Sequence, residues 1–111
     1  MGKYTDKAEF KIPRHIVQKG GVNPETIIVN KTLDYADSTY QLLKNTTGTL
    51  DVILPPVKEG AKFWIKSRAS SSSNIVVKDQ ESPVNTITTL SSGQGVLVVS
   101  DGEYWWDVIK A

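Results

Sequence analysis

The sequence predicts an all-β fold, a jelly-roll-like antiparallel β-sandwich that an extended N-terminal arm precedes. Three observations lead to this prediction. Short β-branched and aromatic segments recur at intervals of roughly ten residues, turn-forming Gly, Pro, Asn and Ser residues separate them, and no useful length of chain repeats apolar residues with a helical period. Such spacing is typical of a sandwich, a jelly roll or a small barrel.

Residues 1–25 are expected to form the arm and residues 26–111 the sandwich domain. The first 19 residues contain five basic and two acidic side chains, whereas the remaining chain contains eight basic and ten acidic ones. Pro13 disfavours a helix in this basic leader, and Gly20-Gly21 followed by Asn23-Pro24 is typical of a hinge. A basic leader with isolated apolar side chains therefore precedes a slightly acidic body.

Eight segments of the domain have the composition of strands. They cover residues 27–29, 40–43, 49–54, 61–67, 75–77, 86–90, 96–100 and 103–109. Alternation is clearest where Leu50, Val52 and Leu54 share one face of a strand. Pro55-Pro56 ends that strand, because proline cannot donate a hydrogen bond to the ladder. Asp101-Gly102 predicts a two-residue type I′ turn between the last two strands.

Composition excludes several classes of function. The chain has 111 residues, enough for one domain, and no cysteine, which excludes a disulfide framework, a thiolate zinc site and a cysteine nucleophile. Its formal net charge of +1 predicts neither nucleic acid nor a membrane as partner. Its apolar runs fall far short of the ~20 residues that cross a bilayer, and the leader lacks the apolar stretch of a signal peptide.

Candidate catalytic and metal-binding residues are few. His15 is the only histidine, whereas a metal site needs three or four converging ligands. Ser70–Ser73 lacks a Gly-x-Ser-x-Gly elbow. Gly93-Gln94-Gly95 precedes a strand, so no helix N-terminus stands behind it to hold a phosphate. We therefore expect no enzymatic activity, no cofactor and no metal.

Aromatic and basic side chains gather on two of the expected strands. Alternation places Lys62, Trp64 and Lys66 on one strand face, and it sends Trp105 and Trp106 to opposite faces, so that one of these two belongs to the core. Tryptophan surface outside the core is typical of protein interfaces. A sugar-stacking platform, a nucleic-acid-binding strand and shielding by the same chain are the alternatives. We predict Lys62, Trp64, Lys66 and Trp105 as interface residues.

The second half of the chain resembles a β-rich pattern of tailed-bacteriophage particle proteins. The pattern comprises Asp51-Val-Ile-Leu-Pro-Pro, Gly60, Phe63-Trp-Ile-Lys66, the serine loop, Asn74-Ile-Val-Val, Leu90-Ser-Ser-Gly-Gln-Gly-Val96, Ser100-Asp-Gly and Trp105. With its size and N-terminal arm, the chain is most similar to capsid decoration proteins of the cement or staple type. The resemblance implies their jelly-roll-like fold.

The resemblance also implies a virion protein that is made in the host cytoplasm and binds the outer surface of the capsid. Such a protein fastens neighbouring major capsid subunits, is expected to form a homodimer on the shell, and contacts neither nucleic acid nor a membrane. A fibre-type or receptor-binding virion module that touches carbohydrate through Trp64 or Trp105 is the alternative.

The arm matches no family motif, and its role is predicted from its residues alone. Apolar anchors and cations that meet an acidic capsid surface would offset the entropy that the arm loses on binding. The predicted capsid-binding residues are Tyr4, Lys7, Phe10, Lys11, Ile12, Arg14, His15 and Ile16.

Overall fold

A computed structural model describes residues 18–69, 73–81 and 84–111, and these residues form β-strands without any helix. The strands are β2 (Val22–Ile27), β3 (Lys31–Thr32), β4 (Tyr40–Asn45), β5 (Leu50–Ile53), β6 (Lys62–Ala69), β7 (Ile75–Lys78), β8 (Thr86–Leu90), β9 (Gly95–Ser100) and β10 (Trp105–Lys110). The all-β class is therefore confirmed.

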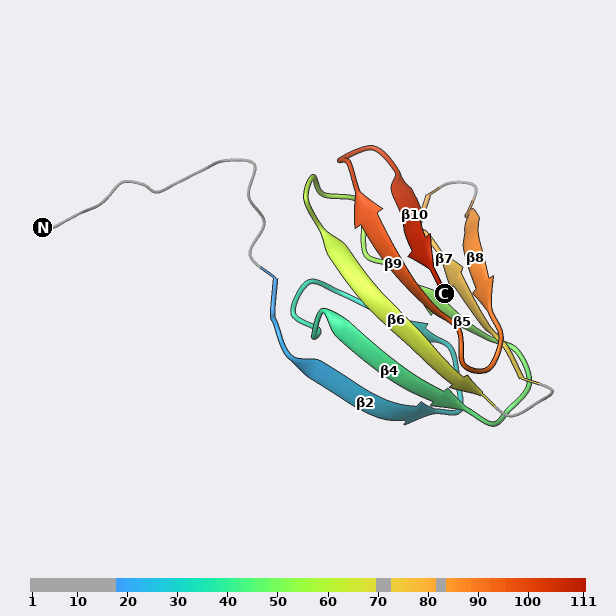
Figure 1. The fold of residues 1–111 in the computed structure, drawn as a ribbon. Helices are drawn as coiled ribbons and strands as arrows, with labels where there is room; N and C mark the ends of the chain where they lie inside the picture. Colours follow the sequence, from blue (N-terminus) through green and yellow to red (C-terminus); the bar gives the residue numbers. More distant parts are fainter. Residues whose placement is uncertain (1–17, 70–72, 82–83) are drawn as a thin grey trace, which may run out of the picture.

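The strands form two sheets (Figure 1). One sheet has five strands in the order β10-β9-β6-β4-β2, and the other has four in the order β3-β5-β7-β8. From β2 to β7 the chain alternates between the sheets, so each coil of the chain contributes one strand to each sheet. Successive coils therefore stack on one another as the repeats of a solenoid do.

The pairing of the strands differs from the prediction. Strands β2, β4 and β6 are parallel neighbours, and so are β3, β5 and β7. Only the pairs β9–β10, β6–β9 and β7–β8 are antiparallel within the described ranges. The expectation of an antiparallel sandwich is therefore wrong, and the mixed sheets do not confirm a jelly roll. Parallel neighbours need a crossover of about a dozen residues, which a strand of the opposite sheet supplies here.

The start of the domain also differs from the prediction. The sequence predicts a first strand at residues 27–29, whereas β2 occupies Val22–Ile27 and β3 follows it. Pro24 fits β2 because this strand is the edge of its sheet, where a missing donor interrupts no ladder. Further upstream, the Gln18 side chain donates to the Lys62 carbonyl and accepts from the Lys62 N–H, both at 2.8 Å. The folded part therefore begins before residue 26.

The core lies between the two sheets and confirms the predicted alternation. Its buried apolar side chains are Ile27, Leu33, Leu43, Leu50, Val52, Leu54, Ala61, Phe63, Ile65, Ile75, Val77, Leu90, Val96, Val98 and Trp105. Phe63 contacts two other aromatic rings, and its ring centroid is 6.4 Å from that of Tyr35 and 6.1 Å from that of Trp105. The Trp105 indole N–H donates to the Pro55 carbonyl at 3.0 Å, so the largest core side chain has its polar atom satisfied.

The loop between β9 and β10 has four residues, Asp101 to Tyr104, and not two. A type I′ turn needs positive φ at both central residues, but Gly102, at +99°, has the only positive φ in this loop. The Asp101 carboxylate instead accepts hydrogen bonds from the N–H groups of Glu103 and Tyr104, both at 2.8 Å. These hydrogen bonds order the loop, and they lower the pKa of Asp101, with that from Tyr104 contributing most.

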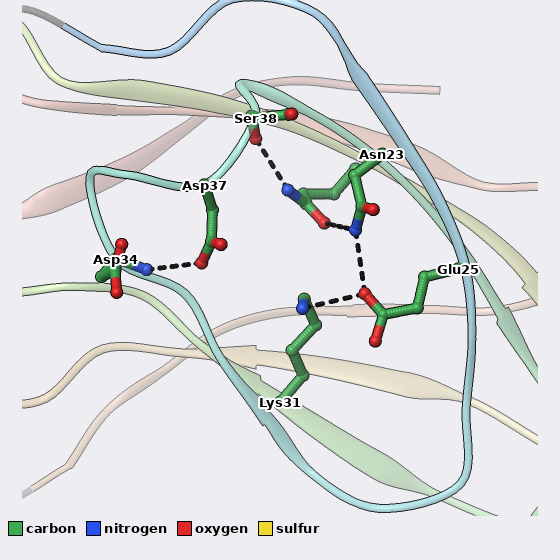
Figure 2. A network of polar contacts seen from close by, with 7 residues as sticks. Asn23, Glu25, Lys31, Asp34, Asp37 and Ser38 are labelled. Carbon is green, nitrogen blue, oxygen red and sulfur yellow. Dashed lines mark hydrogen bonds and ion pairs between the residues drawn. The ribbon is translucent and has the colours of Figure 1, made fainter.

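Polar side chains cover the end of the sandwich where β2 and β3 form the sheet edges (Figure 2). The Asn23 amide donates to the side-chain oxygens of Glu25 at 2.9 Å and Gln41 at 2.8 Å. Lys31 on β3 pairs with Glu25 at 2.9 Å and so joins the two sheets. The Asn23 hydrogen bond, and then Lys31, lower the pKa of Glu25. Within the described residues β2 and β3 belong to the outermost coil, which presents polar groups at the sheet edges, as terminal repeats do.

Candidate functional site

The outward side of the five-stranded sheet is the candidate interaction surface, and we call its side chains the outer face. A residue belongs to the outer face if it alternates with buried residues along its strand, or if strand register places it beside such a residue on the neighbouring strand. The outer face consists of Val22, Pro24, Thr26, Tyr40, Leu42, Lys44, Lys62, Trp64, Lys66, Arg68, Gly95, Leu97, Val99, Trp106 and Ile109.

An apolar row crosses the outer face at right angles to the strands. Register aligns one apolar residue from each of the five strands: Val22, Tyr40, Trp64, Leu97 and Ile109. The Tyr40 and Trp64 rings stack on one another in this row. Beside them lies a hollow of about 290 Å³, whose lining includes Leu42 and Ile109. Contiguous exposed apolar surface of this kind is typical of protein or membrane interaction sites and of ligand-binding grooves.

A basic groove adjoins the apolar row toward the C-terminal ends of β4 and β6. It measures about 680 Å³, and the side chains of Lys44, Lys66 and Arg68 line it together with Leu42. The Lys66 ammonium donates to the Gly93 carbonyl at 2.6 Å, which holds the Lys66 side chain against the loop between β8 and β9. The outer face therefore changes along its strands from aromatic to cationic.

The four predicted interface residues do not share one surface. Lys62, Trp64 and Lys66 lie together on the outer face, as the alternation predicts. Trp105 points into the core with only 5% of its surface exposed, so its assignment to an exposed interface is corrected. Trp106 occupies the outward position instead and is 55% exposed. Local alternation separates the two tryptophans, but only the packing of β10 decides which one is buried.

Sequence reasoning missed the contribution of β4 to this surface, which consists of Tyr40, Leu42 and Lys44. All three alternate with the buried Gln41 and Leu43, so the period of two residues was available as a signal. Their relation to Trp64 was not available, because it depends on the parallel pairing of β4 with β6.

The predicted capsid-binding arm residues lie outside the described residues. These are Tyr4, Lys7, Phe10, Lys11, Ile12, Arg14, His15 and Ile16. The described chain starts at Gln18, whose side chain binds the backbone of Lys62. Gln18 therefore lies beside Lys62 of the outer face.

Two buried or half-buried titratable groups outside this surface have structural roles. The Asp79 carboxylate is buried and accepts hydrogen bonds from the N–H of Asn85 at 2.8 Å and of Glu81 at 3.2 Å. The Tyr35 hydroxyl donates to the Pro56 carbonyl, and burial raises the pKa of Tyr35 to about 12. Within residues 18–69, 73–81 and 84–111, no three His, Cys, Asp or Glu side chains gather to hold a metal ion.

The part of the chain that the structure describes has no helix long and apolar enough to cross a membrane. A scan of protein-family models, a search of curated proteins and a search of solved structures each gave no match to this chain.

Proposed function

We propose that this protein is a non-enzymatic virion structural protein that binds the outside of a bacteriophage capsid and fastens neighbouring major capsid subunits. The observation that carries the proposal is the exposed apolar row on the outer face. Covering such a row with a partner surface is favourable by roughly 25 cal/mol per Å² of apolar area removed from water. The choice of the capsid as partner comes from the sequence resemblance to decoration proteins.

Fastening requires contacts with two different subunits. The outer face supplies one contact, and the basic segment before Gln18 supplies the other through apolar anchors such as Tyr4 and Phe10. Because both contacts belong to one chain, the second forms at high effective concentration. A protein that binds only the assembled shell stabilises that shell by RT ln(1 + [L]/Kd) for each site.

The proposed homodimer on the shell uses a surface other than the outer face. Two copies packed face to face would bring Lys44, Lys62, Lys66 and Arg68 of one copy against the same cations of the other. Like charges that face each other across an interface cost roughly several kcal/mol of binding free energy, so this face-to-face dimer is disfavoured.

Co-sedimentation with empty phage heads tests the proposal. Leu42→Ser removes an exposed apolar side chain from the outer face, and the matched control Val84→Ser removes one from the loop between β7 and β8; the two residues are 44% and 59% exposed. We expect Leu42→Ser to weaken binding by about tenfold, and Val84→Ser to bind as the unchanged protein does. Equal occupancy of heads by both variants, with both still folded, would contradict the proposal.

A carbohydrate-binding fibre module is the second candidate function. Tyr104 and Trp106 form an exposed edge-to-face pair with centroids 6.5 Å apart. They line a hollow of about 380 Å³ together with Asp79 and Asn85, and aromatic surface beside a few polar groups is typical of small-ligand sites. A tryptophan fluorescence change on titration with cell-surface polysaccharide, abolished by Trp106→Ala, would favour this candidate over the capsid.

A further inference from the structure

We infer that the basic groove of the outer face binds a carboxylate-bearing segment of the partner protein, laid across β4 and β6 beside the apolar row. The inference rests on the proposed function, because it names the chemistry by which the same surface recognises its partner. The groove residues that carry it are Lys44, Lys66 and Arg68.

Charge on the outer face is one-sided. Among the outward positions of β2, β4, β6 and β9 there are four cations, Lys44, Lys62, Lys66 and Arg68, and no carboxylate. The whole chain has a formal net charge of only +1, so this face differs from the average surface. Glu25 also lines the groove, but its carboxylate is held by Asn23 and Lys31. The face is therefore electrostatically complementary to an acidic partner.

Lys44 and Arg68 are direct register neighbours on the adjacent parallel strands β4 and β6. Neighbouring strands lie only about 4.8 Å apart, and like charges opposite one another destabilise a sheet. A carboxylate placed between the two side chains replaces this repulsion by charge-assisted hydrogen bonds, which the planar Arg68 guanidinium can make in a bidentate manner. Binding of a carboxylate therefore relieves an unfavourable pair of the free protein.

Lys66 is held in position at the edge of the groove. Its ammonium group donates one hydrogen bond to the Gly93 carbonyl at 2.6 Å and has two further donors. Its stem lies close to Gly95, where an added Cβ would be only 3.1 Å from the Lys66 Cδ atom. The absence of a side chain at Gly95 thus lets Lys66 lie across β9. A side chain that is already ordered loses less entropy when a ligand binds.

Other occupants fit the groove less well. A second copy packed face to face would bring its cations against those of the groove. The segment before Gln18 is basic, so its net charge has the same sign as the groove. Single-stranded nucleic acid matches the charge but needs free aromatic faces for its bases. No aromatic residue is among the described residues that line the groove, and Tyr40 and Trp64 each use one ring face to stack on the other. An acidic protein segment with apolar side chains satisfies both the groove and the apolar row.

The probe for the test is a synthetic peptide rich in Glu and containing Leu in a Ser/Gly background, with a peptide that has Gln at every Glu position as its control. The full chain is titrated with each peptide and followed by amide chemical shifts. We expect the Glu peptide to shift the amides of residues 42–44, 66–68 and 92–93, and to bind about tenfold more tightly than the Gln peptide. Equal binding of the two peptides would overturn the inference.

Variants locate the peptide on the groove. Lys44→Gln combined with Arg68→Gln should weaken binding of the Glu peptide by about tenfold. The control, Lys19→Gln combined with Lys110→Gln, removes the same charge from exposed positions outside the groove and should leave binding unchanged. Equal losses of binding in both double variants would show that only net charge matters and would overturn the inference. Tighter binding of an oligothymidine than of a Glu peptide of equal charge would also overturn it.

Two measurements separate this inference from the proposed function. If the unchanged protein binds phage heads while the Glu peptide shows no binding, the carboxylate-binding groove is refuted and the capsid role stands. If the Glu peptide binds the groove while heads are not bound, the capsid role is refuted and the groove keeps its carboxylate chemistry.

Discussion

The rings of Tyr40 and Trp64 lie almost parallel on neighbouring strands, with centroids 6.4 Å apart and an angle of 4° between their planes. The parallel register of β4 and β6 brings the two residues side by side. Tyr40 is nevertheless 45% exposed, and Trp64 is half-buried. The pair is therefore a pre-arranged aromatic surface, and a partner that covers it has little side-chain freedom left to remove.

A double-mutant cycle measures the stacking of this pair. Tyr40→Ala and Trp64→Ala should show a coupling free energy of about 0.5–1.5 kcal/mol in urea unfolding, because each substitution removes the same ring contact. Trp64→Ala with Val84→Ala is the control, and these two changes should be additive because Val84 lies in a loop of the other sheet. Additive effects of Tyr40→Ala and Trp64→Ala would show that the ring contact contributes nothing.

Substitution of the adjacent tryptophans should have unequal effects on stability. Trp105→Ala removes a buried ring and its hydrogen bond to the Pro55 carbonyl, so we expect a loss of about 3–5 kcal/mol in the free energy of unfolding. Trp106→Ala removes an exposed ring whose indole N–H donates to the Asp101 carboxylate at 3.0 Å, so the loss in the free energy of unfolding should be about 1 kcal/mol. Chemical denaturation distinguishes the two, and similar losses would contradict the inward packing of Trp105.

Substitution of two buried serines by alanine should affect the free energy of unfolding differently. The Ser67 hydroxyl is buried without a hydrogen-bond partner among the described residues, so Ser67→Ala should leave stability unchanged or raise it by up to about 1 kcal/mol. The Ser73 hydroxyl accepts from the Gly48 N–H at 3.0 Å, so Ser73→Ala should lower stability by about 1 kcal/mol. Thermal unfolding of both variants provides the measurement, and a clear loss in Ser67→Ala would reveal a missing partner.

The pKa of the Glu25 carboxyl should respond to removal of Asn23 and to removal of Lys31. Both partners lower the pKa of Glu25 from its ordinary value of 4.5, and the hydrogen bond from Asn23 is the largest single cause. A lowered folded-state pKa contributes stability that is present above the unfolded value and is lost as the pH falls through the folded one.

An NMR pH titration measures this pKa directly. Lys31→Gln should move the pKa of Glu25 upward, toward 4.5, and so should Asn23→Ala. The same variant should make acid unfolding begin at a higher pH than in the unchanged protein. An unchanged pKa of Glu25 in Asn23→Ala would show that the amide hydrogen bond does not lower the pKa of this carboxyl.

Deletion of residues 1–17 should separate folding from binding. The deletion keeps Gln18 and its two hydrogen bonds to Lys62, so the cooperative unfolding transition should remain. Binding to phage heads should fall sharply, because the apolar anchors and cations of the segment are lost. A folded deletion variant that reaches unchanged occupancy on heads would refute a capsid-binding role for the arm.

Much of the local structure can be read from the chain itself. Leu50, Val52 and Leu54 are buried as their alternation predicts, and no described segment is helical. The expected strands from residue 40 onward match β4 to β10 in order and approximate position. The first strand is misplaced because Pro24 and Asn23 are turn-forming residues, and the edge of a sheet tolerates them.

The candidate surface was only partly predictable, for a different reason. Lys62, Trp64 and Lys66 follow from alternation within one strand, whereas the pairing of Lys44 with Arg68 comes from neighbouring strands of successive coils. Nothing in either segment alone specifies its neighbour.

By itself, the amino-acid sequence determined that the chain is all-β, which side chains of each strand share a face, and that charged and aromatic residues accumulate on β6. The tertiary structure alone decided that successive coils stack in parallel, that Trp105 rather than Trp106 is buried, and that cations of β4 and β6 meet in one groove. The reason is physical: alternation is a property of the backbone within one strand, whereas strand partners and register are selected by the burial of apolar faces from distant parts of the chain.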